Sequence, residues 1–458
     1  MKNLLCICIV LFLSVAGCSR EKSGVASQPA VNEVAVATTV LATIADDEKP
    51  LPTIPGHEMP DTQDQSASFQ VIFGESGKGV AYLADKGGKV YVVHNSTRGK
   101  EYASVGTVVL SSDGRRIAYA ARVEGKWSMV VDGREGSPYD VLLTPIFSPD
   151  GQHVAYQAKE GKRWYMVVDN TQNAGTAASY TTPEFSSDSK SIAYVEAAAS
   201  NSKMRLIVSD LKFGKQSEKW SIGDQLFTTN RDRTRIAAVQ VVDSKFRVID
   251  FNFANPDVVH EGPLYDVIEN LVLSDDGMSM SYCALRDRKR LIILDSREEA
   301  LPDGRAPELP AIRPDKKGVG VLLISQDRFF LHQAFLNSKE KGKMYDEAAN
   351  LTYSRDGHYA YAARKGQDWL VVVNGKEGPA FDRVVLPVFS PDGKLVLYRA
   401  RKDGKRFLVV ADTAGKTIKQ QPAYEQVFQP VFTGDGKSVA YGVKDGNKLI
   451  WKVEKLDK

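Results

Sequence analysis

Cysteine is scarce in this chain of 458 residues, which contains four. Cys6 and Cys8 lie in an apolar N-terminal run, and Cys18 directly follows that run. We expect the first two to leave with a cleaved leader and the third to be modified, so that Cys283 alone remains. A disulfide within the mature monomer is therefore excluded. Cys283 stands in a strand-like run (281–284), where we expect a small buried apolar residue rather than a reactive thiol.

The chain also lacks a large excess of positive or negative charge, because it contains 60 Lys and Arg residues and 57 Asp and Glu residues, which gives a formal net charge of +3. The basic residues are scattered along the chain instead of forming stripes. The sequence therefore does not predict nucleic-acid binding.

Motifs for catalysis, metal binding or cofactor binding are absent from the sequence. No Gly-x-Ser-x-Gly elbow of an α/β-hydrolase occurs. The stretch Gly74–Gly79 resembles a phosphate loop only in part and coincides with a repeated turn. The histidines show no metal-ligand spacing; they are His57, His94, His153, His260, His332 and His358. We expect no enzyme, no bound metal and no cofactor.

What the chain does contain is a ten-residue phrase that returns along most of its length. It reads FSSDSKSIAY at 185–194, and close copies are FSPDGQHVAY at 147–156, FSPDGKLVLY at 389–398 and FTGDGKSVAY at 432–441. Looser copies occupy 73–82, where Ser76 replaces the Asp, 110–119 and 273–282, a shorter copy starts at Tyr353, and faint copies surround Asp232 and Asp315. The copies are spaced by about 40 residues, a period typical of stacked supersecondary units.

Each unit has the composition of a short antiparallel meander. The Ser-Pro-Asp-Gly centre of the phrase carries the residues of a tight turn. Apolar runs precede and follow it, as at 144–147, 154–156 and 164–168, and a fourth strand fits at 139–143. The runs are apolar nearly throughout, which indicates burial on both faces. Stacking of neighbouring blades in a ring provides such burial, so the sequence predicts an all-β propeller.

These repeats resemble the WD-like propeller repeats in the C-terminal part of the bacterial envelope protein TolB. The resemblance is carried by [FL]-S-x-D-G-x-x-[VI]-A-Y and by V-V-[DN]-G-x-E-G at 130–136 and 372–378, and it covers most of residues 69–458. It implies a TolB-like β-propeller array at 67–458. The α/β domain that precedes the TolB propeller is not found here, so a role in the TolB complex is not implied.

About ten units exceed the four to eight blades of a usual propeller. The sequence leaves two architectures open, one unusually large ring or two smaller propellers. In the second case the seam is expected where the phrase matches worst, between residues 200 and 345.

The N-terminus predicts a lipoprotein. Residues 1–17 have one charge, an apolar run and a small-residue end, as in a secretory signal peptide. The run Ser14–Cys18 resembles the bacterial lipobox, which implies that Cys18 carries the lipid that anchors the protein in a membrane. Ser19 follows it, and the sorting rule for such lipoproteins then implies the outer membrane, facing the periplasm.

Residues 18–66 have no aromatic side chain and five prolines, so we expect the lipidated Cys and a flexible tether. One alternative stays open, because the apolar run Val34–Leu41 is able to add a closing strand to the propeller.

A recurring acidic pattern, Glu-Gly-x-x-[Tyr/Phe]-Asp, is the main candidate for a site. Its copies are Glu135 with Tyr139-Asp140, Glu261 with Tyr265-Asp266 and Glu377 with Phe381-Asp382, and partial copies are Tyr345-Asp346 and Tyr424-Glu425. Carboxylates repeated around a ring can line a channel and bind a cation. A residue required in every blade more often holds that blade together, which we favour here. Trp127, Trp164 and Trp369 share one place in the unit and are expected to be packing residues.

Three functions remain compatible with the sequence. The first is a non-catalytic envelope lipoprotein whose propeller is a scaffold that binds another envelope protein or a peptide. The second is a propeller that binds or processes a small ligand, cation or glycan at its central channel. The third is an assembly role with no discrete site. The first rests on fold analogy and on the missing catalytic motifs.

Overall fold

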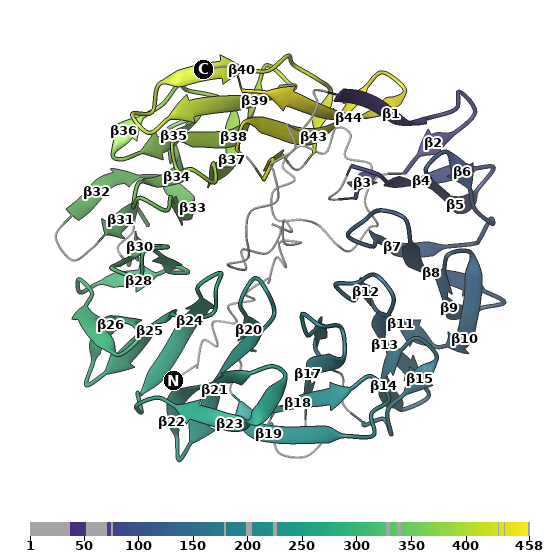
Figure 1. Cartoon of the computed structure of the whole chain (residues 1–458), viewed down its shortest axis with the longest axis horizontal. Coiled ribbons are helices and arrows are strands. Elements are labelled where there is room, and N and C mark those ends of the chain that lie inside the picture. Colours follow the sequence, from purple (N-terminus) through teal and green to yellow (C-terminus); the bar gives the residue numbers. More distant parts are fainter. Residues whose placement is uncertain are drawn as a thin grey trace, which may run out of the picture.

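The computed structural model describes residues 37–51, 71–74, 77–177, 180–197, 204–222, 227–326, 330–336, 340–428, 430–434 and 436–456. Every regular element among them is a β-strand. The strands form one ring of radially arranged antiparallel sheets (Figure 1). No helix of the described residues is long and apolar enough to cross a membrane.

Each unit of the ring has a first strand next to the centre, two middle strands and a fourth strand at the rim (Figure 1). The first strand is often split in two. Unit 1 comprises β2 (Lys49–Pro50), β3 (Val71–Phe73), β4 (Val80–Lys86), β5 (Lys89–His94) and β6 (Thr97–Arg98). Unit 2 comprises β7 (Val105–Leu110), β8 (Ile117–Val123), β9 (Lys126–Val131) and β10 (Arg134–Tyr139). Unit 3 comprises β11 (Val141–Leu142), β12 (Ile146–Phe147), β13 (Val154–Glu160), β14 (Arg163–Val168) and β15 (Thr171–Gln172). Unit 4 comprises β16 (Glu184–Phe185), β17 (Ser191–Ala197), β18 (Met204–Asp210) and β19 (Gln216–Ile222). Unit 5 comprises β20 (Thr228–Thr229), β21 (Arg235–Val242), β22 (Lys245–Asn252) and β23 (Asn255–Glu261).

The second half of the ring continues in the same order. Unit 6 comprises β24 (Val267–Leu273), β25 (Met280–Arg286), β26 (Lys289–Leu294) and β27 (Arg297–Ala300). Unit 7 comprises β28 (Arg305–Pro307), β29 (Ala311–Ile312), β30 (Val319–Ser325), β31 (His332–Leu336) and β32 (Glu340–Tyr345). Unit 8 comprises β33 (Glu347–Tyr353), β34 (Tyr359–Lys365), β35 (Asp368–Val373) and β36 (Lys376–Glu377). Unit 9 comprises β37 (Arg383–Phe389), β38 (Leu395–Lys402), β39 (Lys405–Asp412) and β40 (Thr417–Gln420). Unit 10 comprises β41 (Gln426–Val427), β42 (Val431–Phe432), β43 (Ser438–Asp445), β44 (Lys448–Lys455) and β1 (Ala37–Thr43).

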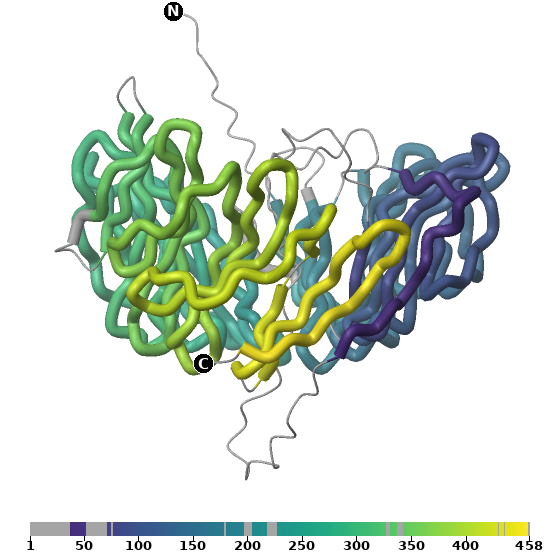
Figure 2. Tube along the Cα trace, turned by 90° about the horizontal axis from the view of Figure 1, so that it is seen from above, coloured from purple at the N-terminus to yellow at the C-terminus, as the bar shows by residue number. Residues whose placement is uncertain are grey.

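Local turn chemistry explains why each unit is a meander. The repeated phrase forms the turn between the first and second strands. The second and third strands of eight units are joined by two-residue turns. In five of these turns both residues have positive φ, as in Glu124 (49°) and Gly125 (86°). Such type I′ turns match the twist of the strands that they join, and Gly adopts them without strain. We call the side of the ring that carries the phrase the turn face, and the side that carries these two-residue turns the hairpin face. The strands run between these two opposite sides (Figure 2).

The core lies between the sheets. Each pair of neighbouring units buries one apolar cluster, and ten such clusters follow one another around the ring. Ala81 and Leu83 of unit 1 pack on Tyr119 and Val130 of unit 2, for example. Every sheet is thus buried on both faces, which is why the strands are apolar nearly throughout.

This continuity decides between the two architectures that the sequence left open. Units 4 and 5 even merge into one eight-stranded sheet, through the single pair Ile222↔Gln240. Apolar clusters also join units 5 to 6 and 6 to 7, where a seam was expected. The described residues therefore form one large ring and not two smaller propellers (Figure 1).

The ring closes through its N-terminal strand. β1 pairs antiparallel with β44 from Ala37↔Val453 to Thr43↔Lys448 and is the rim strand of unit 10. Ala42 and Ile44 pack on Val80 and Tyr82 of unit 1, so that the last cluster of the ring is completed.

The prediction of a tether throughout residues 18–66 is therefore wrong for the described part of that stretch. β1 lies there and closes the ring, which agrees with the alternative in which the run Val34–Leu41 adds a closing strand. β2 also lies in this stretch and pairs with β4 in unit 1. The physical reason is that β44 and unit 1 both offer an apolar surface that only a further strand covers. The remainder of 18–66 lies outside the described residues.

Ring closure can be tested inside β1. Ala42 is 2% exposed and Val40 is 49% exposed. Ala42→Asp places an unpaired carboxylate in the closing cluster and should cost about 2–4 kcal/mol of unfolding free energy. Val40→Asp, on the same strand, should cost much less. Thermal melts of both variants check this, and equal losses from the two substitutions would contradict closure by β1.

Candidate functional site

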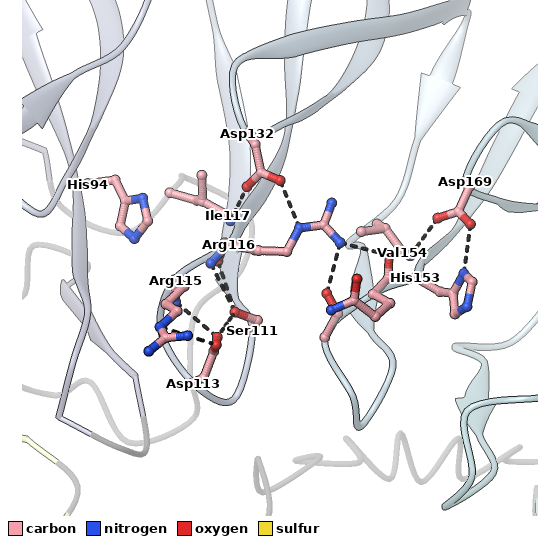
Figure 3. A network of polar contacts seen from close by, with 12 residues as sticks. His94, Ser111, Asp113, Arg115, Arg116, Ile117, Asp132, His153, Val154 and Asp169 are labelled. Carbon is pink, nitrogen blue, oxygen red and sulfur yellow. Dashed lines mark hydrogen bonds and ion pairs between the residues drawn. The ribbon is translucent and has the colours of Figure 1, made fainter.

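The repeated Ser-x-Asp of the phrase is a structural device. Ser111 Oγ donates to Asp113 Oδ1 (2.6 Å), and this carboxylate oxygen accepts the backbone N–H of Arg115 (3.1 Å) (Figure 3). The Ser111 hydroxyl also accepts the backbone N–H of Arg116 (3.0 Å). The hydrogen bond from Ser111 holds the pKa of Asp113 below its ordinary value. The same Ser–Asp bond recurs at Ser148–Asp150, Ser186–Asp188, Ser274–Asp276 and Ser390–Asp392.

A second polar device links neighbouring units. Arg116 donates from Nε to Asp132 Oδ2 (2.8 Å) in its own unit and from Nη1 to the carbonyls of Gly151 (2.8 Å) and Gln152 (2.7 Å) in the next (Figure 3). Asp132 has a φ of 50°, and its other oxygen accepts the backbone N–H of Ile117 (3.0 Å). His153 takes the place of Arg116 in unit 3 and lies 2.9 Å from Asp169. We conclude that these charged residues stabilise the framework.

The carboxylates of the recurring acidic pattern do not converge on the ring centre. Asp140 accepts the backbone N–H of Gly161 (2.7 Å), and Asp266 and Asp382 accept the corresponding N–H groups of Asp287 (3.0 Å) and Asp403 (2.8 Å). Each carboxylate thus caps the two-residue turn of its own unit on the hairpin face. Asp346, from a partial copy, does the same with Gly366 (2.6 Å). Within the described residues, no group of His, Cys, Asp and Glu side chains could hold a metal ion.

The glutamates of the pattern mostly join one unit to the previous one. Tyr102 donates to Glu135 (3.0 Å) and Tyr345 donates to Glu377 (3.1 Å). Glu261 departs from this role, because it forms a two-bond ion pair with Arg247 (2.5 and 2.6 Å). The tyrosine partner in unit 6 is Glu298 (2.7 Å), which the sequence pattern did not single out.

The other candidate residues are framework residues where the structure describes them. Cys283 is 1% exposed in an apolar cluster, and this burial raises the pKa of its thiol, as expected for an unreactive cysteine. Trp127, Trp164 and Trp369 pack in or against inter-unit clusters. His94 and His358 hydrogen-bond to Gly114 and Asn374, both at 2.9 Å, and His260 lies 3.3 Å from Asp250. Tyr424 accepts from Lys452 (2.6 Å), and Glu425 pairs with Lys444. Cys18, Ser19, His57 and Ser76 lie outside the described residues.

At one position near the start of the third strand, units 6, 7 and 9 have a polar residue where other units have an apolar one; in unit 9 it is Arg406, which pairs with Arg401. Trp127 and Trp164 pair with the residues three positions after Tyr119 and Tyr156. In the same register of unit 6 stands Arg290, and in unit 7 stands His332. Each faces a glutamate of its unit's first-strand segment. Arg290 Nη1 donates to Glu269 Oε1 (2.6 Å), and His332 Nδ1 lies 3.6 Å from Glu308 Oε1.

Unit 8 extends this polar stretch with a third pair, in which Arg364 lies 2.7 Å from Glu347 of its first strand. We name Glu269, Arg290, Glu308, His332, Glu347 and Arg364 the inner polar sector. First strands β24, β33 and β37 also contain bulges with Asn270, Asn350 and Leu386 at φ of 61°, 60° and 52°. Such positive φ is costly for Leu, and bulges next to a site re-aim side chains.

Burial tunes the charges of the central pair of this sector. It raises the pKa of Glu308 to about 7 and lowers the pKa of His332. Near neutral pH the Glu308 carboxyl is therefore present in both its protonated and its ionised form, and the lowered pKa of His332 favours an uncharged imidazole. His332 Nδ1 has no hydrogen-bond partner among the described residues. The sequence contained one indication of this sector, namely the polar residues Arg290 and His332 at the position where units 2, 3 and 8 have Trp.

Comparison with known proteins finds only distant structural likeness. No protein-family model and no curated protein matches the chain. Solved structures that match include TolB from Acinetobacter baumannii (14% identity over 68% of this chain and 78% of that chain, TM-score 0.29). They also include a eukaryotic initiation factor (10% identity, 76% and 97%, TM-score 0.44) and the Dos1 propeller (11% identity, 84% and 91%, TM-score 0.36). All three TM-scores are below 0.5, so nothing about this chain is concluded from these likenesses.

The capping role of the hairpin-face carboxylates makes a direct prediction. Asp140→Asn, Asp266→Asn or Asp382→Asn removes a charged acceptor from one turn and should lower the melting temperature by a few degrees. Millimolar Ca²⁺ should not change the melting temperature of the parent chain, because these carboxylates cap turns and form no metal-binding group among the described residues. Melts with Ca²⁺ and with chelator test this. A Ca²⁺-dependent rise that is lost in the triple Asn variant would show that the carboxylates bind a cation.

The pKa of Glu308 predicts a pH dependence of stability. The folded protein binds this proton more tightly than the unfolded chain, whose carboxyl has the ordinary value of 4.5. The stabilisation is complete below pH 4.5 and is lost as pH rises through 7. Relative to Glu308→Gln, the parent should therefore lose unfolding free energy between pH 5 and 8. The comparison isolates Glu308, because His332 is present in both chains. Denaturant titrations at several pH values measure the difference, and a constant difference would contradict the shift.

Proposed function

We propose that the protein is a membrane-anchored envelope lipoprotein whose β-propeller is a non-catalytic scaffold for another envelope protein or a peptide. The lipobox-like run that ends at Cys18 supports the anchor, and Ser19 supports the outer membrane facing the periplasm. A large rigid ring with two broad faces suits protein binding, since loops and inner strands at its surface vary while the sheets remain fixed.

The observation that carries the proposal is that the polar residues fall into two groups, those that recur around the ring and bond within the framework and those that occur in a few units only. The repeated Ser, Asp and Tyr–Glu groups bond within and between units, as at Ser111–Asp113 and Tyr102–Glu135. The inner polar sector is instead confined to three consecutive units. Its glutamates lie on or next to the first strands, and their basic or imidazole partners lie on the second or third strands. Polar residues that the framework does not require are the ones expected to contact a partner. Three carboxylates with their cationic or imidazole partners provide acceptors and donors for a peptide backbone or for polar side chains.

A second function is favoured by one specific observation. Glu308, with its pKa near 7 beside the imidazole of His332, also suits a small ligand, a cation or a glycan bound near the ring centre. Such a ligand would bind to the purified protein without any other protein. The two functions therefore differ in whether a macromolecular partner is needed.

Crosslinking in intact cells followed by affinity purification tests the scaffold function. The parent chain should capture one or more envelope proteins in stoichiometric yield. A variant with Glu269→Gln, Glu308→Gln and Glu347→Gln should capture them several-fold less, because the sector loses its charged acceptors while its shape is kept.

A matched control replaces framework carboxylates on other units, through Asp113→Asn, Asp188→Asn and Asp392→Asn. This control should lose stability and keep its partners. The same purification from Cys18→Ala cells, in which the protein should move to the soluble fraction, shows whether capture needs the anchor. Equal capture by both triple variants, or no captured protein at all, would contradict the scaffold at this sector.

A further inference from the structure

A ring of cationic residues lies on the hairpin face. The third strand of a unit begins with Lys or Arg in seven units, namely with Lys89, Lys126, Arg163, Lys245, Lys289, Lys405 and Lys448. The exceptions are Met204, His332 and Asp368. The residue before the turn is often cationic too, as in the pairs Lys86↔Lys89 and Lys402↔Lys405.

These residues share one side of the molecule because of the register of the strands. Each of these residues belongs to the last residue pair of its hairpin, directly beside the two-residue turn, as in Arg286↔Lys289 and Asp445↔Lys448. The units repeat around one ring with their hairpins on the same side, so the cations are distributed around a whole face instead of forming one cluster (Figures 1 and 2).

Many of these cations remain accessible. Lys89, Lys289, Lys405 and Lys448 are exposed, and none of them forms an ion pair with another described residue. The hairpin face also carries carboxylates, which weaken its positive potential. Asp140 and Asp266 lie 3.4 Å from Lys126 and Lys245, and they use their other oxygen to cap turns.

The turn face has a different charge pattern. Its repeated residue is the Asp of the phrase, and a cation close to it is often paired with an Asp. Lys394 lies 3.9 Å from Asp392, and Lys316 lies 2.9 Å from Asp276. The two faces of one nearly neutral chain therefore differ in the residue that most units repeat.

The cationic ring is interrupted on one side by apolar residues. In unit 7 the connection between β30 and β31 exposes Phe330, at 64%. Met344, which pairs with Gln333 near the start of β31, is 52% exposed, and Leu264, just before the residue that bridges to Phe246, is 44% exposed. These side chains lie toward the hairpin ends of units 5 and 7, on either side of unit 6. Exposed aromatic and aliphatic residues next to Lys and Arg are the combination that binds membrane interfaces.

We propose that the hairpin face adsorbs to the surface of an anionic lipid bilayer, with its lysines against the headgroups and Phe330 inserted among them. A planar charged surface can contact all the hairpins of a ring together, whereas a compact acidic protein would contact only one sector. Basic residues near an anionic membrane are attracted within a Debye length, which makes such binding salt-dependent. The inference concerns a different face from the inner polar sector and does not depend on the proposed scaffold function.

The position of β1 is compatible with this orientation. β1 begins at Ala37↔Val453, away from the hairpin of unit 10, and ends at Thr43↔Lys448, beside it. The chain before Ala37 therefore starts from the turn-face end of the rim. Residues 19–36 outnumber the seven residues of β1, so their greatest possible span, about 3.3–3.6 Å per residue, exceeds the length of β1 and permits this orientation for a lipid on Cys18.

Vesicle sedimentation of the full chain carrying Cys18→Ala, in which no acyl chain contributes, tests the proposal. The probe is vesicles of phosphatidylcholine with phosphatidylglycerol, compared with vesicles of phosphatidylcholine alone. The protein should sediment with the anionic vesicles and be released by high salt. Lys89→Glu, Lys289→Glu and Lys405→Glu together should lower the partition coefficient at least about tenfold. Phe330→Ser should also lower it at low salt, because the ring no longer inserts among the headgroups.

The matched control reverses three exposed cations of the turn face, through Lys190→Glu, Lys317→Glu and Lys394→Glu. It changes the net charge equally and should keep binding within about twofold. All of these side chains are exposed, so circular dichroism and thermal melts should match those of the parent. Equal loss from both triple variants would overturn the assignment of the face. Absence of vesicle binding, including the case in which the chain binds soluble poly-glutamate instead, would overturn the lipid surface.

Discussion

Closure of the ring is the constraint on which the rest of this structure depends. Each sheet is apolar on both faces, so no unit can be stable with one face in water, and each needs a neighbour on either side. Ten inter-unit clusters satisfy this requirement, and the cluster that joins unit 10 to unit 1 includes Ala42 and Ile44 from the N-terminal segment. The last rim position is filled by β1 because β44 would otherwise present an unpaired edge. The strand that follows the expected lipid attachment site is thus also the strand that completes the fold.

The same constraint explains why so many polar residues are structural. Sheets that stack radially have their turns at two faces, where backbone groups need partners that the next strand does not supply. Ser111, Asp113 and Asp140 provide such partners, and Arg116 reaches the carbonyls of the next unit. Residues that recur in every unit serve the framework, and residues that interrupt the recurrence are the ones left for binding. Arg290 and His332, in the register of a packing Trp, are the clearest interruptions, and Phe330 is another on the hairpin face.

Much of the fold follows from the sequence, because Ser-x-Asp-Gly and the apolar runs act over a few residues. They predict the meander, the period and the all-β ring. The number of rings does not follow, since it depends on a small rotation between sheets that no single motif encodes. The role of β1 stayed ambiguous because an uncharged run such as Ala37–Thr43 is equally a strand or a linker until its partner β44 is known. The capping role of Asp140 was predictable. The role of Glu261 was not, because it pairs with Arg247, and the glutamate that accepts from a tyrosine of the previous unit is Glu298 in unit 6. The inner polar sector was missed because its residues come together across strands, in the region where the phrase is faintest.

Single-particle electron microscopy of the purified chain tests ring closure most directly. Projections down the shortest axis should show one closed ring of radial sheets, with continuous density between the unit that contains β44 and the unit that contains β4. Two smaller rings, or one ring with a gap at this junction, would contradict the account.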